Sequence, residues 1–129
     1  GVLLGAAGAG KVASAPRADY AEGAAAVLLG EGHDGKVYEL SGDHAWDYPE
    51  LAAAIGEVIG REVVYRDLST EEYIAALVAA GVPEGGAQFA AGADAGIKAG
   101  LLADATADLR TLIGRPTTRL VEALRAALV

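Results

Sequence analysis

The 129-residue chain carries 10 Lys and Arg against 18 Asp and Glu, a formal net charge of -8, and 53% of its residues are hydrophobic while only 5% are aromatic. This length suits one domain with a thin, alanine-rich core. The negative charge would repel a phosphate backbone, so nucleic-acid binding is not expected. The absence of cysteine excludes disulfide scaffolds, thiolate metal sites and cysteine nucleophiles. It fits a cytoplasmic protein, and a secreted protein without cysteine is the alternative.

Neither a membrane segment nor a signal peptide is expected from the sequence. The longest apolar stretches, such as Ala24–Leu29, are far shorter than the roughly 20 residues that span a bilayer. The chain begins at Gly1 without methionine and without the basic start of a signal peptide. We therefore expect a piece of a longer protein whose start lies upstream.

The first third of the chain predicts an extended segment, a helix and a strand. Lys11–Ala15 precedes Pro16, and a proline disfavours helical geometry in the residue before it. An alanine-rich helix then runs to about Leu29, with Asp19 in its first turn, where a negative charge favours the positive end of the helix dipole. Lys36–Leu40 alternates apolar and polar residues with the period of a strand.

The middle of the chain contains two helix starts separated by a strand. Asp47 and Glu50 have capping-box spacing, and Ser69 and Glu72 repeat it. Glu62–Asp67 is rich in β-branched residues and predicts the strand between these helices. Since strands and helices alternate, we expect α/β architecture with some parallel pairing. The glycines expected to end the two helices are Gly60 and Gly81.

The last third has a weaker pattern. Five glycines between residues 85 and 100 interrupt an alanine run, which predicts a broken or mobile helix. Thr106 is a candidate cap for a short helix that ends at Gly114, and Thr117 or Thr118 would start the last helix. No repeat or linker divides the chain, so residues 1–129 are treated as one unit.

The glycines from Gly5 to Gly10 suggest a phosphate-binding loop, but their context does not match one. A dinucleotide fingerprint needs a helix directly after the glycines, and Lys11 to Pro16 cannot be helical. We interpret this stretch as a structural loop, with ligand contact as the alternative. No tyrosine has a lysine four positions later, and no metal is predicted because the two histidines lie in turns without convergent ligands.

Two further sites deserve a functional and a structural interpretation. Arg17, Asp19 and Tyr20 lie at a strand-to-helix junction, the place where open α/β sheets bind ligands. The alternative is an ion pair between Arg17 and Asp19, with Tyr20 packed against the protein. Trp46 follows a strand end and either lines a pocket or anchors the core near a helix start.

Four segments, spread in order over nearly the whole chain, resemble the second half of the NmrA-like NAD(P)H-dependent quinone oxidoreductases. They are Lys11–Ala21, Glu31–Asp43, Ala93–Ile97 and Leu112–Thr118. The resemblance implies a Rossmann-type atypical short-chain dehydrogenase/reductase, of which residues 1–129 form the C-terminal part: the last Rossmann elements and a smaller substrate-binding region. The N-terminal dinucleotide-binding domain is absent from this sequence.

The resemblance also implies a function and places some residues. NADPH or NADH, bound mainly by the absent half, would reduce a quinone or a similar small carbonyl compound. Lys36–Leu40 would be a late strand of the Rossmann sheet, while Lys11–Ala15 and Glu62–Asp67 would belong to the substrate region. No residue is assigned a catalytic role. The candidates for lining the pocket are Gly8, Gly10, Ser14, Arg17, Tyr20 and Trp46.

Two other functional classes stay open from the sequence. NmrA-like proteins include regulators that bind nucleotide without turnover, so a sensor or interaction module is the alternative to an enzyme. An independently folded small α/β protein is a third reading. A piece of a larger sheet would expose an apolar edge and tend to self-associate, because an unpaired strand edge is a template for another chain.

Overall fold

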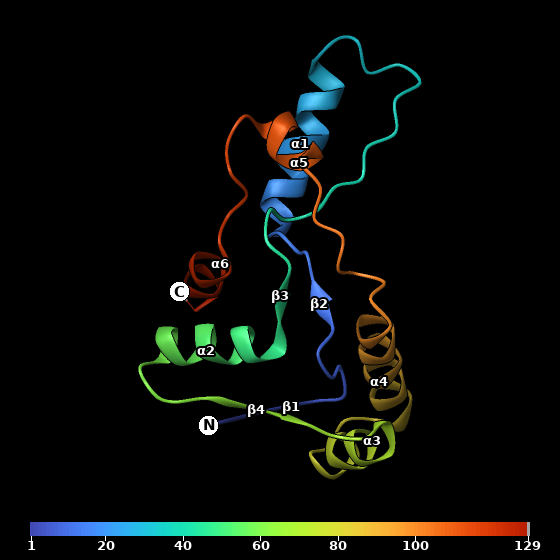
Figure 1. Cartoon of the computed structure of the whole chain (residues 1–129), viewed down its shortest axis with the longest axis vertical. Coiled ribbons are helices and arrows are strands. Elements are labelled where there is room, and N and C mark those ends of the chain that lie inside the picture. Colours follow the sequence, from blue (N-terminus) through green and yellow to red (C-terminus); the bar gives the residue numbers. More distant parts are fainter. Residues whose placement is uncertain (129) are drawn as a thin grey trace.

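A computed structural model describes residues 1–128, with helices and strands distributed along the whole chain (Figure 1). The elements, in chain order, are β1 (Val2–Gly5), β2 (Lys11–Val12), α1 (Arg17–Leu29), β3 (Trp46–Asp47), α2 (Tyr48–Ile59), β4 (Val64–Asp67), α3 (Thr70–Ala79), α4 (Glu84–Lys98), α5 (Asp108–Ile113) and α6 (Leu120–Ala127). This mixture of helices and strands confirms the expected α/β class.

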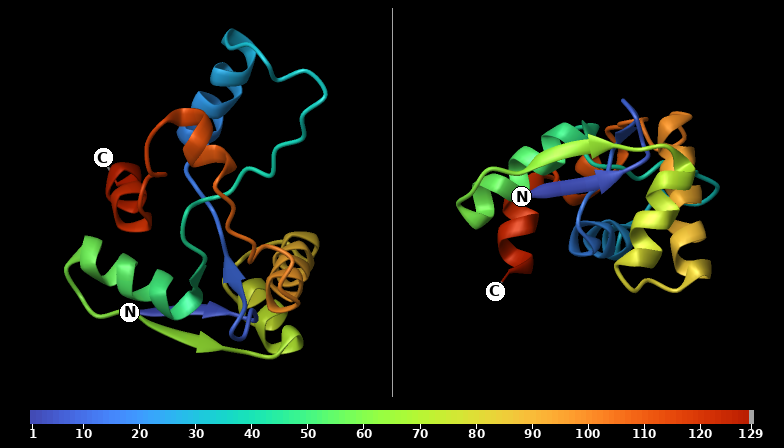
Figure 2. Two further views of the ribbon diagram at one scale, coloured as in Figure 1. Left: turned by 45° about the horizontal axis from the view of Figure 1, so that its top comes forward. Right: turned by 90° about the horizontal axis from the view of Figure 1, so that it is seen from below.

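The strands form two small sheets. Strands β1 and β4 are parallel, with Val2 opposite Val64 and Gly5 opposite Asp67, and Figure 2 shows them side by side below α2. Strands β2 and β3 are antiparallel, with Val12 opposite Trp46. The parallel pair confirms the pairing expected from strand and helix alternation, and its carboxyl ends meet at one edge.

The two predicted capping boxes are present. The Asp47 side chain accepts a hydrogen bond from the backbone N–H of Glu50 at 2.9 Å, and the Glu50 side chain accepts one from the backbone N–H of Asp47 at 3.0 Å. Ser69 and Glu72 make the same reciprocal pair at the start of α3. Helix α2 ends at Gly60, whose φ of 71° is in the left-handed region, as predicted.

The predicted strand at Lys36–Leu40 is wrong. The segment is part of a long connection from α1 to β3 (Figure 2), and no described strand pairs with it. Side chains satisfy part of its backbone instead: the N–H of Glu39 donates to Asp108 Oδ2 at 2.8 Å, and the Thr106 hydroxyl donates to the Glu39 carbonyl. An alternating pattern favours an extended chain, but a strand also needs a neighbour.

The prediction of a broken helix between residues 85 and 100 is also wrong, because α4 is continuous from Glu84 to Lys98. The buried residues of α4 recur every three or four positions and form one face, and Asp94 on this face contacts Ala6 in the loop after β1 and Tyr48 at the start of α2. Gly85 and Gly92 have open space around them, so they destabilise the helix only through the low helix propensity of glycine. Packing of the apolar face outweighs that cost of about 1 kcal/mol per glycine. The buried residues are Ala87, Ala91, Asp94 and Ile97.

The C-terminal segment differs from expectation in its partners. Helix α6 begins after Arg119, not at Thr117 or Thr118. The backbone N–H and the hydroxyl of Thr118 instead donate to Asp19 on α1. Asp19 pairs with Arg115 at 2.8 Å, so the alternative of an ion pair between Arg17 and Asp19 is wrong. The cation that neutralises Asp19 comes from 96 residues along the chain, beyond the reach of a local pattern.

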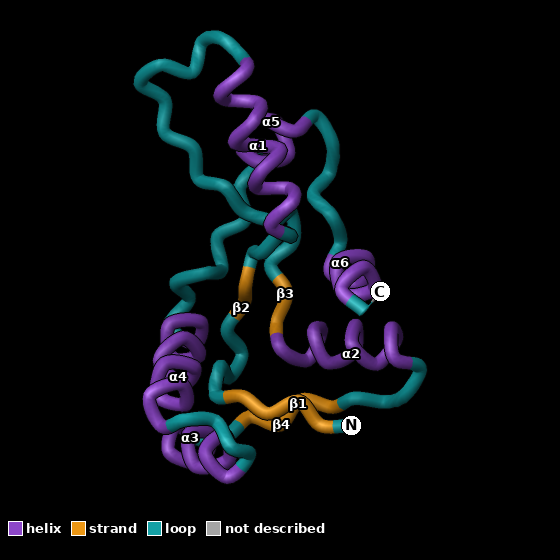
Figure 3. The backbone as a smooth tube through the Cα atoms, turned by 180° about the vertical axis from the view of Figure 1, so that it is seen from behind, coloured by secondary structure: helices purple, strands orange, loops and turns teal. Residues whose placement is uncertain are grey.

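The core is thin, as the composition predicts. Most fully buried hydrophobic residues are alanines, and Leu109 on α5, with no exposed surface, is the largest of them. Leu109 fits where Gly23 lacks a side chain: a Cβ at Gly23 would lie 2.7 Å from Leu109 Cδ1. Figure 3 shows α1 and α5 packed together at one end of the molecule, while α2 lies between α6 and the β1–β4 pair.

Candidate functional site

A cluster of tyrosines and carboxylates lies at the carboxyl ends of β1 and β4. Asp94, buried on α4, accepts a hydrogen bond from the N–H of Ala6 at 2.7 Å and one from the Tyr48 hydroxyl at 2.5 Å. The Tyr65 hydroxyl donates to Asp67 at 2.8 Å. Asp67 also accepts from the N–H of Gly8 at 2.9 Å. This cluster therefore fixes the loop that follows β1.

The electrostatics of this cluster oppose proton donation. Burial raises the pKa of the Tyr48 hydroxyl above its usual range, and the hydrogen bond to Asp94 raises it further. Burial and Asp67 have the same effect on the pKa of Tyr65. A general acid is most effective when its pKa lies near the working pH, and the pKa values of both hydroxyls are shifted away from it. We therefore interpret the cluster as structural support and assign no proton donor to it.

A groove between α2 and α6 is the second candidate. Its volume is about 530 Å³, within the usual range for sites that bind small organic molecules. Its apolar walls come from both helices and from β3, and they consist of Trp46, Ala53, Ala54, Leu120 and Val121.

Trp46 is the aromatic wall of this groove. Its indole N–H donates to the Ser14 hydroxyl at 3.0 Å, which orients the ring. The ring also stacks on Tyr48, with centroids 6.2 Å apart and 27° between the planes. Two smaller cavities of about 140 Å³ adjoin the groove and are both lined by Ser14 and Trp46. The structure thus places Trp46 in a cavity wall instead of in the core.

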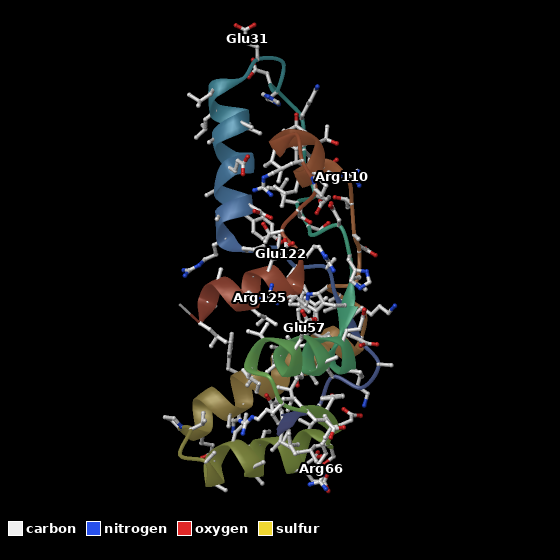
Figure 4. All side chains as sticks on the ribbon, turned by 90° about the vertical axis from the view of Figure 1, so that its left-hand side faces the viewer. Glu31, Glu57, Arg66, Arg110, Glu122 and Arg125 are labelled. Atoms are coloured by element: carbon white, nitrogen blue, oxygen red, sulfur yellow. The ribbon has the colours of Figure 1, made fainter. Side chains whose placement is uncertain are left out.

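Four charged or titratable side chains line the groove. His44 and Glu50 hydrogen-bond at 2.9 Å, and this contact, followed by the N–H of Asp47, lowers the pKa of Glu50. Glu57 on α2 pairs with Arg125 on α6 at 3.2 Å, as the sticks in Figure 4 allow the reader to follow. Within residues 1–128, Arg119 makes no ion pair and is the groove cation without a carboxylate partner.

Two aspartates hold the α6 side of the groove in place. Asp19 is only 2% exposed and accepts from Arg115 Nη2 at 2.8 Å and from the Thr118 N–H at 2.7 Å. The N–H of Asp43 donates to the Thr117 hydroxyl at 2.9 Å, and the Thr117 N–H donates back to the Asp43 carboxylate at 2.9 Å. These contacts fix residues 115–118 and hence the position at which α6 starts.

The six candidates from the sequence do not form one site. Ser14 and Trp46 meet at the groove, whereas Gly8 belongs to the tyrosine–carboxylate cluster. Gly10 packs so closely on the Ile97 carbonyl of α4 that a Cβ there would clash, which supports a structural role. The remaining two, Arg17 and Tyr20, lie in the first turn of α1, exposed and half-buried respectively.

Sequence reasoning missed Arg119 and the partners of Asp19. Arg115 and Thr118 lie within the segment Leu112–Thr118 that carried the family resemblance, which was the available signal. Arg119 follows directly but belongs to no motif, so only the placement of α6 beside α2 brings it to the groove. Residues 1–128 contain no group of three His, Asp or Glu side chains that could hold a metal ion.

No helix within the described residues is long and apolar enough to cross a membrane. No protein-family model matches the chain.

Comparison with known proteins gives consistent matches. The chain is 49% identical over 124 residues to quinone oxidoreductase 2 of Escherichia coli, covering 96% of this chain and 43% of that protein. The crystal structure of an NADPH-dependent quinone oxidoreductase from Escherichia coli in complex with NADPH superposes with a TM-score of 0.92 and 47% identity, over 99% of this chain and 45% of that one. Triphenylmethane reductase from Citrobacter sp. superposes with a TM-score of 0.95 and 39% identity, over 99% of this chain and 44% of that one.

These matches confirm the resemblance and the Rossmann-type reductase fold that it implied. They involve proteins more than twice as long as the matched segment. The chain is a homologue of the NmrA-like quinone oxidoreductases of the quinone oxidoreductase 2 type, and it spans less than half the length of the relatives that it matches.

Proposed function

We propose that this chain forms the substrate-side portion of an NAD(P)H-dependent oxidoreductase that reduces quinones or similar carbonyl compounds. The observation that carries the proposal is the match to quinone oxidoreductase 2 at 49% identity over 96% of the chain. The groove between α2 and α6 is the proposed acceptor site, because it combines the volume for a small aromatic molecule with the ring of Trp46.

The proposed cofactor is NADPH, as in the Escherichia coli relative solved with it. Among the described residues, β1 leads into a loop and then into β2, so no helix opens after the glycines to face a pyrophosphate. These residues do not fit the phosphates of a dinucleotide. The proposal therefore assigns NADPH mainly to residues outside this chain.

This chain's own residues would bind and orient the acceptor. When bound, NADPH supplies a hydride, and one further proton from water completes the hydroquinone. The walls of the groove exclude water from one face of the acceptor, and Trp46 offers a surface for stacking. Ser14 holds the indole through its hydrogen bond and is a positioning residue.

The proposed domain assignment treats residues 1–129 as one C-terminal portion that includes the last Rossmann elements. Its support is the exposure of large apolar side chains at the end of α1 and in the segment that follows. Leu28, Leu29 and Val37 are 83%, 88% and 85% exposed. In the longer protein these side chains would be covered by the rest of the sheet, and in the isolated chain they would promote self-association. A cytoplasmic location stays a prediction.

The test uses the full natural polypeptide that contains these residues. We expect isothermal titration to show NADPH binding, and we expect NADPH absorbance at 340 nm to fall when a quinone is added. If NADPH binds but no quinone or related carbonyl compound is reduced, the alternative of a nucleotide sensor holds. If neither NADPH nor NADH binds, the oxidoreductase proposal is wrong.

A further inference from the structure

The charged side chains that line the α2–α6 groove differ in whether they have a partner of opposite charge. Glu50 hydrogen-bonds to His44 at 2.9 Å, a contact that is an ion pair only when the imidazole is protonated, and Glu57 pairs with Arg125 at 3.2 Å. Arg119, at the start of α6, has no carboxylate partner among residues 1–128. An anionic group on a bound molecule would give its guanidinium the bidentate partner that this side chain favours.

The position of Arg119 is fixed by its neighbours in the chain. The preceding residue, Thr118, is held to the buried Asp19 through its N–H and its hydroxyl, at 2.7 and 3.0 Å. The following residues, Leu120 and Val121, form an apolar wall of the groove. The backbone of Arg119 is therefore anchored on both sides, so that only its side chain has to be ordered when a ligand binds.

The opposite side of the groove is aromatic and apolar. Trp46 lines it together with Ala53 and Ala54, and stacking on Tyr48 limits the motion of the indole ring. A volume of about 530 Å³ accommodates a fused two- or three-ring molecule. One groove thus presents a flat aromatic surface and a cation, Arg119, that makes no ion pair within residues 1–128.

We propose that the groove prefers planar aromatic acceptors that carry one anionic substituent, a carboxylate or a sulfonate, which pairs with Arg119 while the ring stacks on Trp46. That the ligand is an electron acceptor rests on the proposed function, whereas its binding to the groove does not. The inference adds a charge preference and names Arg119 as the residue that determines it.

Binding can be tested on the chain itself, with the indole N–H of its only tryptophan as the probe. The ligand pair is anthraquinone-2-sulfonate and the neutral 2-(hydroxymethyl)anthraquinone, which share the ring system. Since the chain has no cysteine, thiol addition to a quinone does not occur. We expect both ligands to shift the Trp46 resonance, with the sulfonate binding about fivefold more tightly, as is typical of a partly exposed ion pair.

Arg119→Gln should remove that fivefold preference and leave the affinity for the neutral ligand unchanged. Arg110→Gln is the matched control, since Arg110 is an exposed arginine on α5, far from Glu57 and Arg125 of the groove in Figure 4. It should retain the preference. Equal affinity for the two ligands in the parent chain, or an unchanged preference in Arg119→Gln, would overturn the inference.

A second readout separates this inference from the proposed function. In the full natural polypeptide, the ratio of the KM values for the neutral and the sulfonated quinone should fall about fivefold in Arg119→Gln and stay at the parent value in Arg110→Gln. If the sulfonate binds at Arg119 but no NADPH is oxidised, the proposed function fails and the charge preference stands. If turnover occurs with no effect of Arg119→Gln on the ratio, the preference fails and the proposed function stands.

Discussion

Asp19 accepts three long-range hydrogen bonds from the C-terminal segment, one from Arg115 and two from Thr118. Burial raises the pKa of its carboxyl, but the hydrogen bonds from Arg115 and Thr118 outweigh burial, and the pKa lies below its usual range. A carboxyl whose pKa is lowered by folding stabilises the folded state above its unfolded pKa of about 3.9. That contribution is lost as the pH falls through the folded pKa.

We expect Asp19→Asn to lower the free energy of unfolding at pH 7 by about 2 kcal/mol, because a buried charged hydrogen-bonding group loses its pairing with Arg115. Urea unfolding followed by circular dichroism measures the change. Asp34→Asn, in an exposed turn, is the control and should stay within about 0.5 kcal/mol of the parent. An equal effect of the two substitutions would show that Asp19 is not a stabilising centre.

The pH dependence of stability gives a separate test of the same residue. Between pH 7 and pH 3 the parent should lose more stability than Asp19→Asn, because the variant has no carboxyl to protonate at this site. Urea midpoints collected across this range give the two curves. Parallel curves would contradict the lowered pKa of Asp19.

At the scale of elements, the sequence predicted what depends on near neighbours. The capping boxes at Asp47 and Ser69 involve residues three positions apart, and both are present. The predicted strand at Lys36–Leu40 was wrong because no partner strand lies beside it among the described residues. The predicted break in α4 was wrong because packing of its buried face keeps the helix continuous. Local pattern carries no information on either.

The glycines of α4 provide a test at this scale. Gly92 lies in the helix interior with nothing near the position of an added Cβ. Gly92→Ala should therefore raise the free energy of unfolding by about 0.5–1 kcal/mol, through lower entropy of the unfolded chain and better helix propensity. Thermal or urea unfolding measures it.

Gly114→Ala is the contrasting variant. Gly114 ends α5 with φ of 68°, a conformation that alanine adopts at a cost of about 1 kcal/mol. The free energy of unfolding should fall in Gly114→Ala and rise in Gly92→Ala. Destabilisation by both substitutions would contradict the open space around Gly92.

The candidate site was only partly predictable. Trp46 was identified because it follows a strand end and Ser14 because its segment resembles the family, and the pairing of β2 with β3 brings them together. Arg119 could not be found in this way, since it reaches the groove through the packing of α6 on α2, whose residues are about 60 positions away. Long-range helix packing, not a motif, completes the site.

At the scale of the whole molecule, the exposed apolar end of α1 leads to a prediction about association. Light scattering should show an apparent mass that rises with concentration for the isolated chain. Val37→Lys should lower this association, because a charge on the exposed surface opposes burial. Phe89→Lys, which alters an exposed residue of α4, is the control and should have little effect. A constant monomer mass at every concentration would contradict the proposed surface.

The central claim is that the α2–α6 groove binds the acceptor of an NADPH-dependent reductase. The most direct test is steady-state kinetics of Trp46→Ala in the full natural polypeptide, combined with titration of NADPH. The account predicts that KM for the quinone rises about tenfold, from the loss of stacking and buried ring area, while the Kd for NADPH stays the same. An unchanged KM, with quinone reduction intact, would contradict it.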